Sequence, residues 1–142
     1  MEKQNDMLLR VKDLRVYYTA GGEIINAVNG VDLEVRRGET LGLVGETGAG
    51  KTTIAKSIMR ILPDPPAKIG GGEIYLDGQE LLHLPEKKMR EIRGKKISMI
   101  FQDPMTALNP VLSVGDQISE VIRLHEKASR AEANAKAAEM LE

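Results

Sequence analysis

The sequence contains no cysteine, no tryptophan, one phenylalanine and three tyrosines among its 142 residues. Because cysteine is absent, this stretch excludes a disulfide framework and a thiolate metal site, and it suits a reducing compartment. No run of 18 apolar residues occurs, so the chain is not expected to span a membrane by itself. The polar N-terminal stretch MEKQNDMLLRVKDL lacks the apolar core of a signal peptide. The formal net charge of −1 gives no reason to expect a nucleic-acid partner.

What is present is the composition of a globular domain, with 42% hydrophobic and 29% charged residues. Residues 14–18 and 31–35 alternate between apolar and polar, which predicts strands with one buried and one wet face. Residues 40–44 are nearly all apolar, the pattern of a strand covered on both faces, and residues 97–101 are mostly apolar. We therefore expect strands at residues 14–18, 31–35, 40–44, 73–76 and 97–101, with turns at Gly21-Gly22 and Asp77-Gly78.

Two helices are predicted in the middle of the chain. The first has one apolar face, made of Ile54, Ile58, Ile61 and Leu62, and Pro63 is expected to stop it. The second, around residues 86–93, is rich in Lys and Arg. We interpret its charges as a solvated helix face, and a phosphate-rich partner is the alternative.

Two more helices are predicted near the C-terminus. One begins at Ser113 and carries an apolar stripe. The other begins at a capping box formed by Ser129 and Glu132. This Ala-rich helix is expected to be still running, uncapped, at Glu142, which we interpret as a truncation.

The strongest signal in the sequence is a phosphate-loop motif. The run Gly45-Glu46-Thr47-Gly48-Ala49-Gly50-Lys51-Thr52 fits G-x-x-x-x-G-K-[ST] at every fixed position. Its three glycines can adopt positive φ, so the backbone N–H groups can curl round a phosphate. A helix beginning near Lys51 points its positive end at the same place. Lys51 adds a full charge at the β- and γ-phosphates, and the Thr52 hydroxyl can bind Mg²⁺.

Other interpretations of this loop have less support. A chance glycine-rich turn would not require the buried strand predicted before it or the amphipathic helix predicted after it. A dinucleotide-binding loop needs G-x-G-x-x-G, whereas Gly48 and Gly50 are followed by Thr53. The motif alone does not distinguish kinases, GTPases, helicases and transporters, so the flanking residues have to decide.

The flanking residues resemble those of the ATP-binding-cassette ATPases along essentially the whole chain. The resemblance is carried by residues 26–39, by the loop itself, by the hairpin at 72–78 and by Ile100-Phe101-Gln102-Asp103-Pro104, which is similar to the family's Q-loop. It implies an α/β fold, a P-loop NTPase of the ABC type, truncated. Residues 1–103 would form the antiparallel β subdomain and the nucleotide-binding core. Residues 104–142 would form the Q-loop exit and the first part of the helical subdomain.

The resemblance also implies roles for single residues. Gln102 would contact the catalytic Mg²⁺ and the attacking water, and would report the nucleotide state to a transmembrane partner. Tyr18 lies where the family places an aromatic ring on adenine; the alternatives are Tyr17 in that role and an ordinary core aromatic. The implied ligands are ATP and Mg²⁺. ATP would be held by Tyr18 and by every residue from Gly45 to Thr53, with Lys51 and Gln102 catalytic and with Thr52 and Gln102 on the metal.

The run from Gln102 to Pro110 narrows the resemblance. It is similar to the Q-D-P-x-[ST]-[AS]-L-N-P run of dipeptide, oligopeptide and nickel importers. That implies an ATPase subunit at the cytoplasmic face of the membrane that couples ATP hydrolysis to import of di- or oligopeptides. Its partners would be transmembrane permeases, a second ATP-binding subunit and, indirectly, an extracytoplasmic solute-binding protein, with no nucleic acid. Nickel or another solute, an exporter, a non-transport cassette protein and a non-catalytic nucleotide-binding module remain as alternatives.

Several motifs of the family do not occur in this sequence. The Leu-Ser-Gly-Gly-Gln signature, the Asp-Glu pair of Walker B and the switch histidine normally come later, and neither His83 nor His125 is expected to act in catalysis or on a metal. We therefore expect ATPase activity of the full-length protein, and no appreciable steady-state turnover by these 142 residues alone. The family's Walker B strand lies beside the strand at 41–44, so that run is expected to lack a neighbour.

Overall fold

The computed structural model describes residues 6–103 and 107–142. Residues 104–106, the Pro-Met-Thr of the importer-like run, lie outside the described residues. The chain forms two compact units, Met1–Pro85 and Glu86–Glu142, and each is described by itself. The predicted division into residues 1–103 and 104–142 is a division by function, whereas these units are defined by their internal packing. The predicted division therefore stays a prediction.

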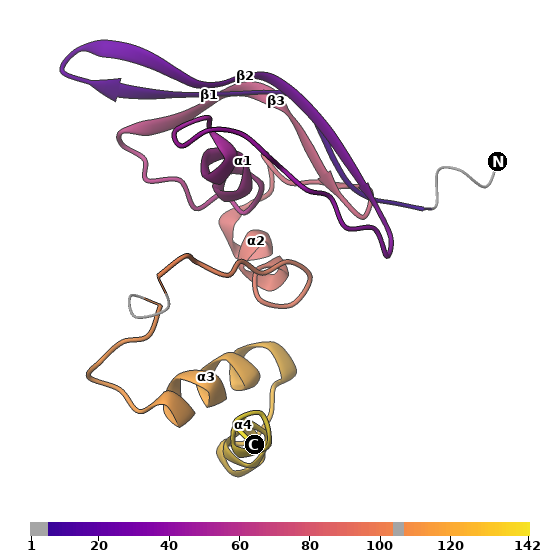
Figure 1. Ribbon diagram of the computed structural model, residues 1–142. Helices are drawn as coiled ribbons and strands as arrows, with labels where there is room; N and C mark the ends of the chain where they lie inside the picture. The colour runs from indigo at the N-terminus through magenta and orange to yellow at the C-terminus, as the bar shows by residue number, and fades with distance from the viewer. Residues whose placement is uncertain (1–5, 104–106) are drawn as a thin grey trace. The chain divides into compact units, whose positions relative to one another are not determined.

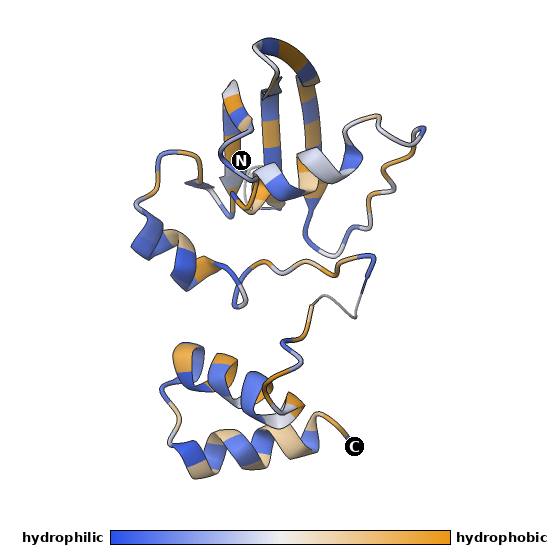
Figure 2. Cartoon of the chain, turned by 90° about the vertical axis from the view of Figure 1, so that its left-hand side faces the viewer, coloured by the Kyte–Doolittle hydropathy of each residue, from blue (hydrophilic) through white to orange (hydrophobic). Residues whose placement is uncertain are grey.

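A four-stranded antiparallel sheet is the main element of the first unit (Figure 1). Its strands are β1 (Met7–Ala20), β2 (Glu23–Arg36), β3 (Ala67–Leu76) and β4 (Gln79–Glu80), in the order β2-β1-β3-β4. The strands predicted at 14–18, 31–35 and 73–76 and both predicted turns are confirmed, and the strands are longer than expected. Polar and apolar residues alternate along them (Figure 2). β1 is paired on both sides and supplies the buried core residues Val11, Leu14 and Val16.

The two mostly apolar runs expected to form strands do not form them, so this prediction was wrong. Residues 40–44 and 98–101 have no regular secondary structure, and Ile97 makes only an isolated bridge to Arg93. Val44 is 95% exposed and Ile100 is 97% exposed. The physical reason is that a strand needs a neighbouring strand for its backbone hydrogen bonds. Within the described part of the chain, no strand pairs with residues 40–44.

The helix α1 (Lys51–Ile58) follows the glycine loop directly, as predicted, and lies against the sheet (Figure 1). It buries Ile54, Ser57 and Ile58. Its predicted apolar face was too long, because Ile61 and Leu62 come after the end of the helix and are half-buried.

A Schellman motif ends α1 before Pro63 is reached. Arg60 adopts a left-handed conformation with φ 52°, its N–H donates to Ser57 O at 3.0 Å, and the Ile61 N–H donates to Lys56 O at 3.0 Å. These two bonds satisfy carbonyls that the end of the helix would otherwise leave without partners. Glycine is the usual residue at the left-handed position, so an arginine there does not signal the end of a helix.

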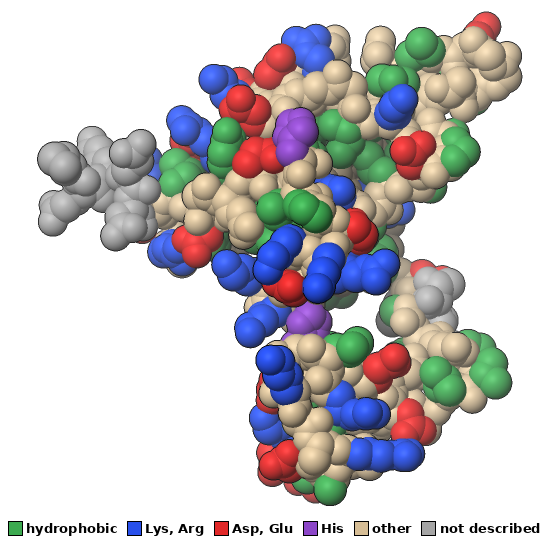
Figure 3. All heavy atoms as spheres, turned by 180° about the vertical axis from the view of Figure 1, so that it is seen from behind, with side chains coloured by type: hydrophobic (Ala, Val, Ile, Leu, Met, Phe, Trp, Pro, Cys, Tyr) green, Lys and Arg blue, Asp and Glu red, His purple; other side chains and the backbone are tan. Residues whose placement is uncertain are grey.

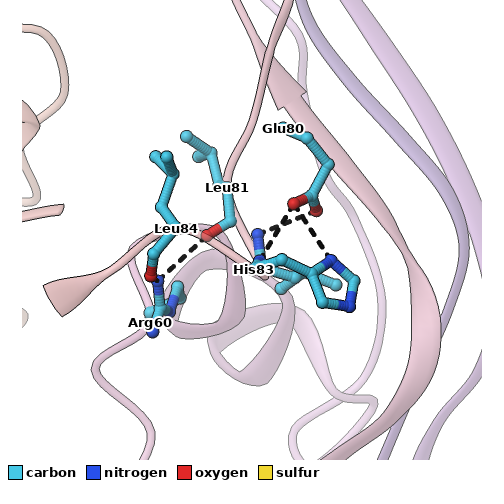
Figure 4. Close-up of polar contacts among 6 residues, drawn as sticks. Arg60, Glu80, Leu81, His83 and Leu84 are labelled. Atoms are coloured by element: carbon cyan, nitrogen blue, oxygen red, sulfur yellow. Dashed lines mark hydrogen bonds and ion pairs between the residues drawn. The ribbon is translucent and has the colours of Figure 1, made fainter. Parts of the chain in front are cut away.

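The side chain of Arg60 also fixes the turn that follows β4 (Figure 4). Its Nη1 donates to Leu81 O at 3.0 Å and to Leu84 O at 2.6 Å. From the other side, the Glu80 carboxylate accepts from Leu82 N–H at 2.8 Å and from His83 N–H at 2.9 Å, and it bonds His83 Nδ1 at 3.1 Å. Burial raises the pKa of Glu80, but the hydrogen bonds from His83 and Leu82 outweigh it and hold that pKa below its ordinary value.

The second unit is helical, with α2 (Glu86–Ile92), α3 (Val114–Glu126) and α4 (Arg130–Glu139), so all three predicted helices are present. The expectation that the last one is still running at Glu142 was wrong: α4 ends at Glu139, where the Leu141 N–H donates to Ala138 O at 3.0 Å in a tighter turn. α3 and α4 pack around a small core of Ile122, Ala133 and Ala137, with the partly buried Ile118 and Ala128 packed against it. The predicted capping box at Ser129 and Glu132 is present, with both reciprocal bonds formed. Among the described residues, no helix is both long and apolar enough to cross a membrane.

The basic stretch around α2 is on the surface, where Figure 3 shows Lys and Arg side chains gathered. Lys88 pairs with Glu91 at 3.0 Å, and Arg93 pairs with Glu86 at 2.6 Å. Met89 and Ile92 form the buried side of the helix. This is the arrangement expected of a solvated helix face interrupted by its own acidic partners.

Candidate functional site: the glycine loop and its helix

The glycine loop requires glycine at two positions for different reasons. Gly48 and Gly50 both have φ 84°, a conformation that costs a residue with a side chain about 1–2 kcal/mol. A Cβ at Gly48 would meet nothing within 4 Å, whereas one at Gly50 would lie 2.5 Å from Ala27 O on β2. Gly50 therefore also allows the loop to pass close to the sheet. Gly45 does not have a positive φ, so the loop uses this conformation at two of its three glycines.

The side chain of Lys51 folds back into the loop. Its Nζ donates to Gly45 O and, at 2.6 Å, to Glu46 O, and the Ala49 N–H donates to Glu46 O at 3.1 Å. An ammonium has three donors, so one remains beside these two bonds. The loop thus holds a positive charge at the point where the helix begins.

The first turn of α1 adds backbone donors at the same point. The Ile54 N–H is bonded within the helix to Gly50 O at 2.9 Å. The N–H groups of Lys51, Thr52 and Thr53 precede that bond and have no intrahelical acceptor. Backbone donors and the positive end of a helix dipole make an anion site, and Lys51 strengthens it. The exposed loop residues Glu46, Thr47 and Ala49 leave this site open to a ligand from solvent.

The two candidate tyrosines contact different parts of the first unit. The Tyr18 hydroxyl lies 3.3 Å from Thr53 Oγ1 on α1, and its ring is half-buried. The ring of Tyr17 covers Gly70, where a Cβ would lie 2.9 Å from Tyr17 Cε1. Tyr18 is therefore the tyrosine that contacts the helix of the glycine loop.

Gln102 belongs to the second unit, where it is exposed in a bend. Its predicted contact with Mg²⁺ and water stays a prediction. His83 and His125 were expected to have no metal role. Within residues 6–103 and 107–142 no group of three or more His, Cys, Asp or Glu side chains is placed to hold a metal.

The family of this chain is indicated by its similarity to known proteins. A family model described as ABC transporter matches residues 28–142. The probable peptide ABC transporter ATP-binding protein y4tR of Sinorhizobium fredii is 51% identical over 136 residues, which are 96% of this chain and 41% of that protein. The oligopeptide transport ATP-binding protein OppD of Bacillus subtilis is 47% identical over 135 residues, 95% of this chain and 38% of that protein.

A solved structure, the dimeric post-hydrolysis state of the ATP-binding cassette MJ0796 bound to ADP and Pi, matches with a TM-score of 0.76 at 25% identity. The match covers 93% of this chain and 55% of that one. The chain spans about two fifths of the length of the curated relatives it matches. On the family match, the sequence identity and the shared fold, the chain belongs to the ABC transporter family, with the α/β fold of its ATP-binding cassettes.

Proposed function

We propose that this chain is the nucleotide-binding part of an ATPase subunit that drives peptide import through a membrane transporter. The observation that carries the proposal is the loop at residues 45–50, with the Lys51 ammonium inside it and the start of α1 beside it. A nucleotide triphosphate needs several N–H donors and a positive charge in a small volume, and this loop supplies both. The peptide class of the solute is supported by the names of the relatives.

Within this proposal, the residues of the loop divide the work. Lys51 would give its charge to the β- and γ-phosphates, and the N–H groups from Gly45 to Thr53 would bind their oxygens. Tyr18 would stack on adenine, a role supported by its contact with Thr53 on the loop's helix. Gln102 would orient the attacking water, since phosphoryl transfer depends on positioning and charge neutralisation.

Mg²⁺ fits the chemistry of the proposed donor set. Thr52 and Gln102 offer a hydroxyl and an amide oxygen, which are hard ligands. Mg²⁺ keeps several waters and binds the phosphates of its nucleotide, so it does not require a cluster of protein carboxylates. Bound there, the ion would neutralise charge on the phosphate oxygens during transfer.

The proposed partners are supported by the family to which the chain belongs. Transmembrane permeases would supply the path for the solute, and this chain would lie at the cytoplasmic face of the membrane beside them. A second ATP-binding subunit is supported by the dimeric cassette that shares this fold. A solute-binding protein outside the membrane would deliver the peptide to the permeases.

Calorimetric titration of the chain with Mg-ATP tests the proposal. Lys51→Ala removes the charge inside the loop and is expected to lower the affinity at least tenfold, the effect of about 1.4 kcal/mol. Lys56→Ala is the matched control, because it removes a lysine from the same helix away from the loop, and it is expected to bind like the parent chain. A folded parent chain that does not bind Mg-ATP, or equal binding by the parent chain and Lys51→Ala, contradicts the proposal.

A further inference from the structure

The side chain of Gln117 on α3 makes four hydrogen bonds, all to the backbone of the residues just before the helix. Its Oε1 accepts from the Asn109 N–H at 2.8 Å, and its Nε2 donates to Asn109 O at 3.0 Å. The same Nε2 lies 3.2 Å from Leu112 O and 3.4 Å from Ser113 O. An amide NH₂ has two protons, so these three carbonyls share them. The amide therefore pairs with Asn109 through donor and acceptor together, as the backbone of an adjacent strand would.

The segment from Asn109 to Ser113 has further polar contacts of its own. Asn109 Oδ1 accepts from the Val111 N–H at 3.0 Å, and the Leu112 N–H donates to Asn109 O at 3.2 Å. Ser113 Oγ caps α3 by accepting from the Asp116 N–H at 3.1 Å. These bonds form turns along the segment and at its end.

Apolar burial does not hold this segment in place. Val111 is 87% exposed and Leu112 is 50% exposed, and Asn109 and Pro110 are exposed as well. Gln117 is the half-buried residue that ties the segment to the body of the helix. Because hydrogen bonds from one side chain replace packing here, removing that side chain should free the segment.

We propose that Gln117 is a positioning residue that joins residues 109–113 to the packed α3–α4 hairpin. The inference rests on the proposed function, in which Gln102 responds to the nucleotide. Asn109 follows Gln102 by only seven positions in the sequence. With 109–113 fixed to α3, a displacement that starts at Gln102 passes to the hairpin, whereas a loose segment absorbs it. Gln117 then contributes to the coupling of ATP turnover and not to the binding of ATP.

The first test compares Gln117→Glu with a control in the full-length ATPase assembled with its membrane partners. Gln117→Glu keeps the size and the acceptor for Asn109, but it removes the NH₂ group and sets a carboxylate against three carbonyl oxygens. We expect kcat for ATP to fall about tenfold, equivalent to about 1.4 kcal/mol, with KM unchanged. Leu124→Glu adds the same charge to the same helix at a position that is 72% exposed, and we expect it to behave like the parent protein.

The pH profile of Gln117→Glu separates positioning from general damage. A protonated carboxyl has one O–H donor and one acceptor, so it can pair with Asn109 again. The nearby carbonyl oxygens raise the pKa of that carboxyl, so the bonded neutral form dominates below the raised pKa and is lost as pH rises through it. The ratio of variant kcat to parent kcat is therefore expected to rise as pH falls.

The outcomes distinguish this inference from the proposed function. A kcat equal to that of the parent protein, or a reduced kcat whose ratio does not change with pH, overturns the role of Gln117. If the variant does not assemble, hydrogen exchange of the parent protein decides. Slow exchange at the Asn109 N–H supports the positioning of this segment by Gln117, and exchange at the rate of an open loop contradicts it. Failure of the parent protein to bind ATP would instead count against the proposed function.

Discussion

The glycine loop separates two apolar stretches that behave differently. After the loop, α1 forms a regular helix in which Ile54 is 6% exposed and Ile58 is 8% exposed. Before the loop, residues 40–44 have a more apolar sequence than α1, yet they form no strand, and Val44 is 95% exposed. A helix makes its hydrogen bonds within its own residues, whereas a strand makes them with residues that are often far away in the sequence. The less apolar of the two stretches is therefore the one that forms regular structure, because its hydrogen bonds need no distant partner.

The largest effect is expected at the junction of these two stretches. Gly50→Ala combines an unfavourable φ with a Cβ placed 2.5 Å from Ala27 O. We expect a loss of about 4 kcal/mol, about 1–2 from the backbone and the rest from the displaced neighbour. Gly48→Ala has the same φ without a close neighbour, so about 1–2 kcal/mol is expected. Urea unfolding of both variants measures the difference, and equal losses would show that the close approach to β2 carries no cost.

The second prediction compares the two stretches directly. Ile54→Ala empties a buried position of α1 and should destabilise the chain by about 3 kcal/mol. Val44→Ala shortens a side chain that is almost fully exposed and should change stability by less than about 0.5 kcal/mol. The same unfolding assay applies to both. A large loss for Val44→Ala would mean that residues 40–44 are packed, and the contrast across the loop would disappear.

How far the sequence predicts this molecule depends on the range of the interactions involved. The glycine loop with the helix after it, the capping box at Ser129 and the turn at Asp77-Gly78 depend on neighbours a few residues apart. All three are present where the sequence indicates them. The strands predicted at 40–44 and 97–101 would need neighbouring strands from other parts of the sequence. An apolar pattern does not show whether such neighbouring strands are present. The stop of α1 was misplaced for another reason, since Arg60 occupies a position where glycine would have marked the end.

Arg60 provides a test of how α1 is ended on the packed side of the loop. Arg60→Ala loses the bonds to Leu81 O and Leu84 O, so we expect a loss of about 2–3 kcal/mol. Like the parent chain, this variant keeps an unfavourable left-handed backbone at residue 60. Arg60→Gly loses the same bonds but relieves the backbone, and it should be about 1 kcal/mol more stable than Arg60→Ala. Thermal or urea unfolding of the pair measures this. If the two variants are equally stable, the left-handed residue does not determine where the helix ends.

The smallest effect is expected at Glu80, which fixes the same turn from the opposite side. Its pKa is lowered in the folded chain, so its contribution is present above the pKa of an unfolded glutamate and is lost as pH falls through the lower, folded value. Glu80→Gln removes the titrating group and keeps one acceptor oxygen, whereas in Glu80 the N–H groups of Leu82 and His83 bond different carboxylate oxygens. The stability of the parent chain should therefore fall more steeply on acidification than that of Glu80→Gln, and the two curves should approach each other at low pH. Urea midpoints measured across the acidic range check this. Parallel curves would mean that the Arg60 side chain holds the turn after β4 without a contribution from the Glu80 carboxylate.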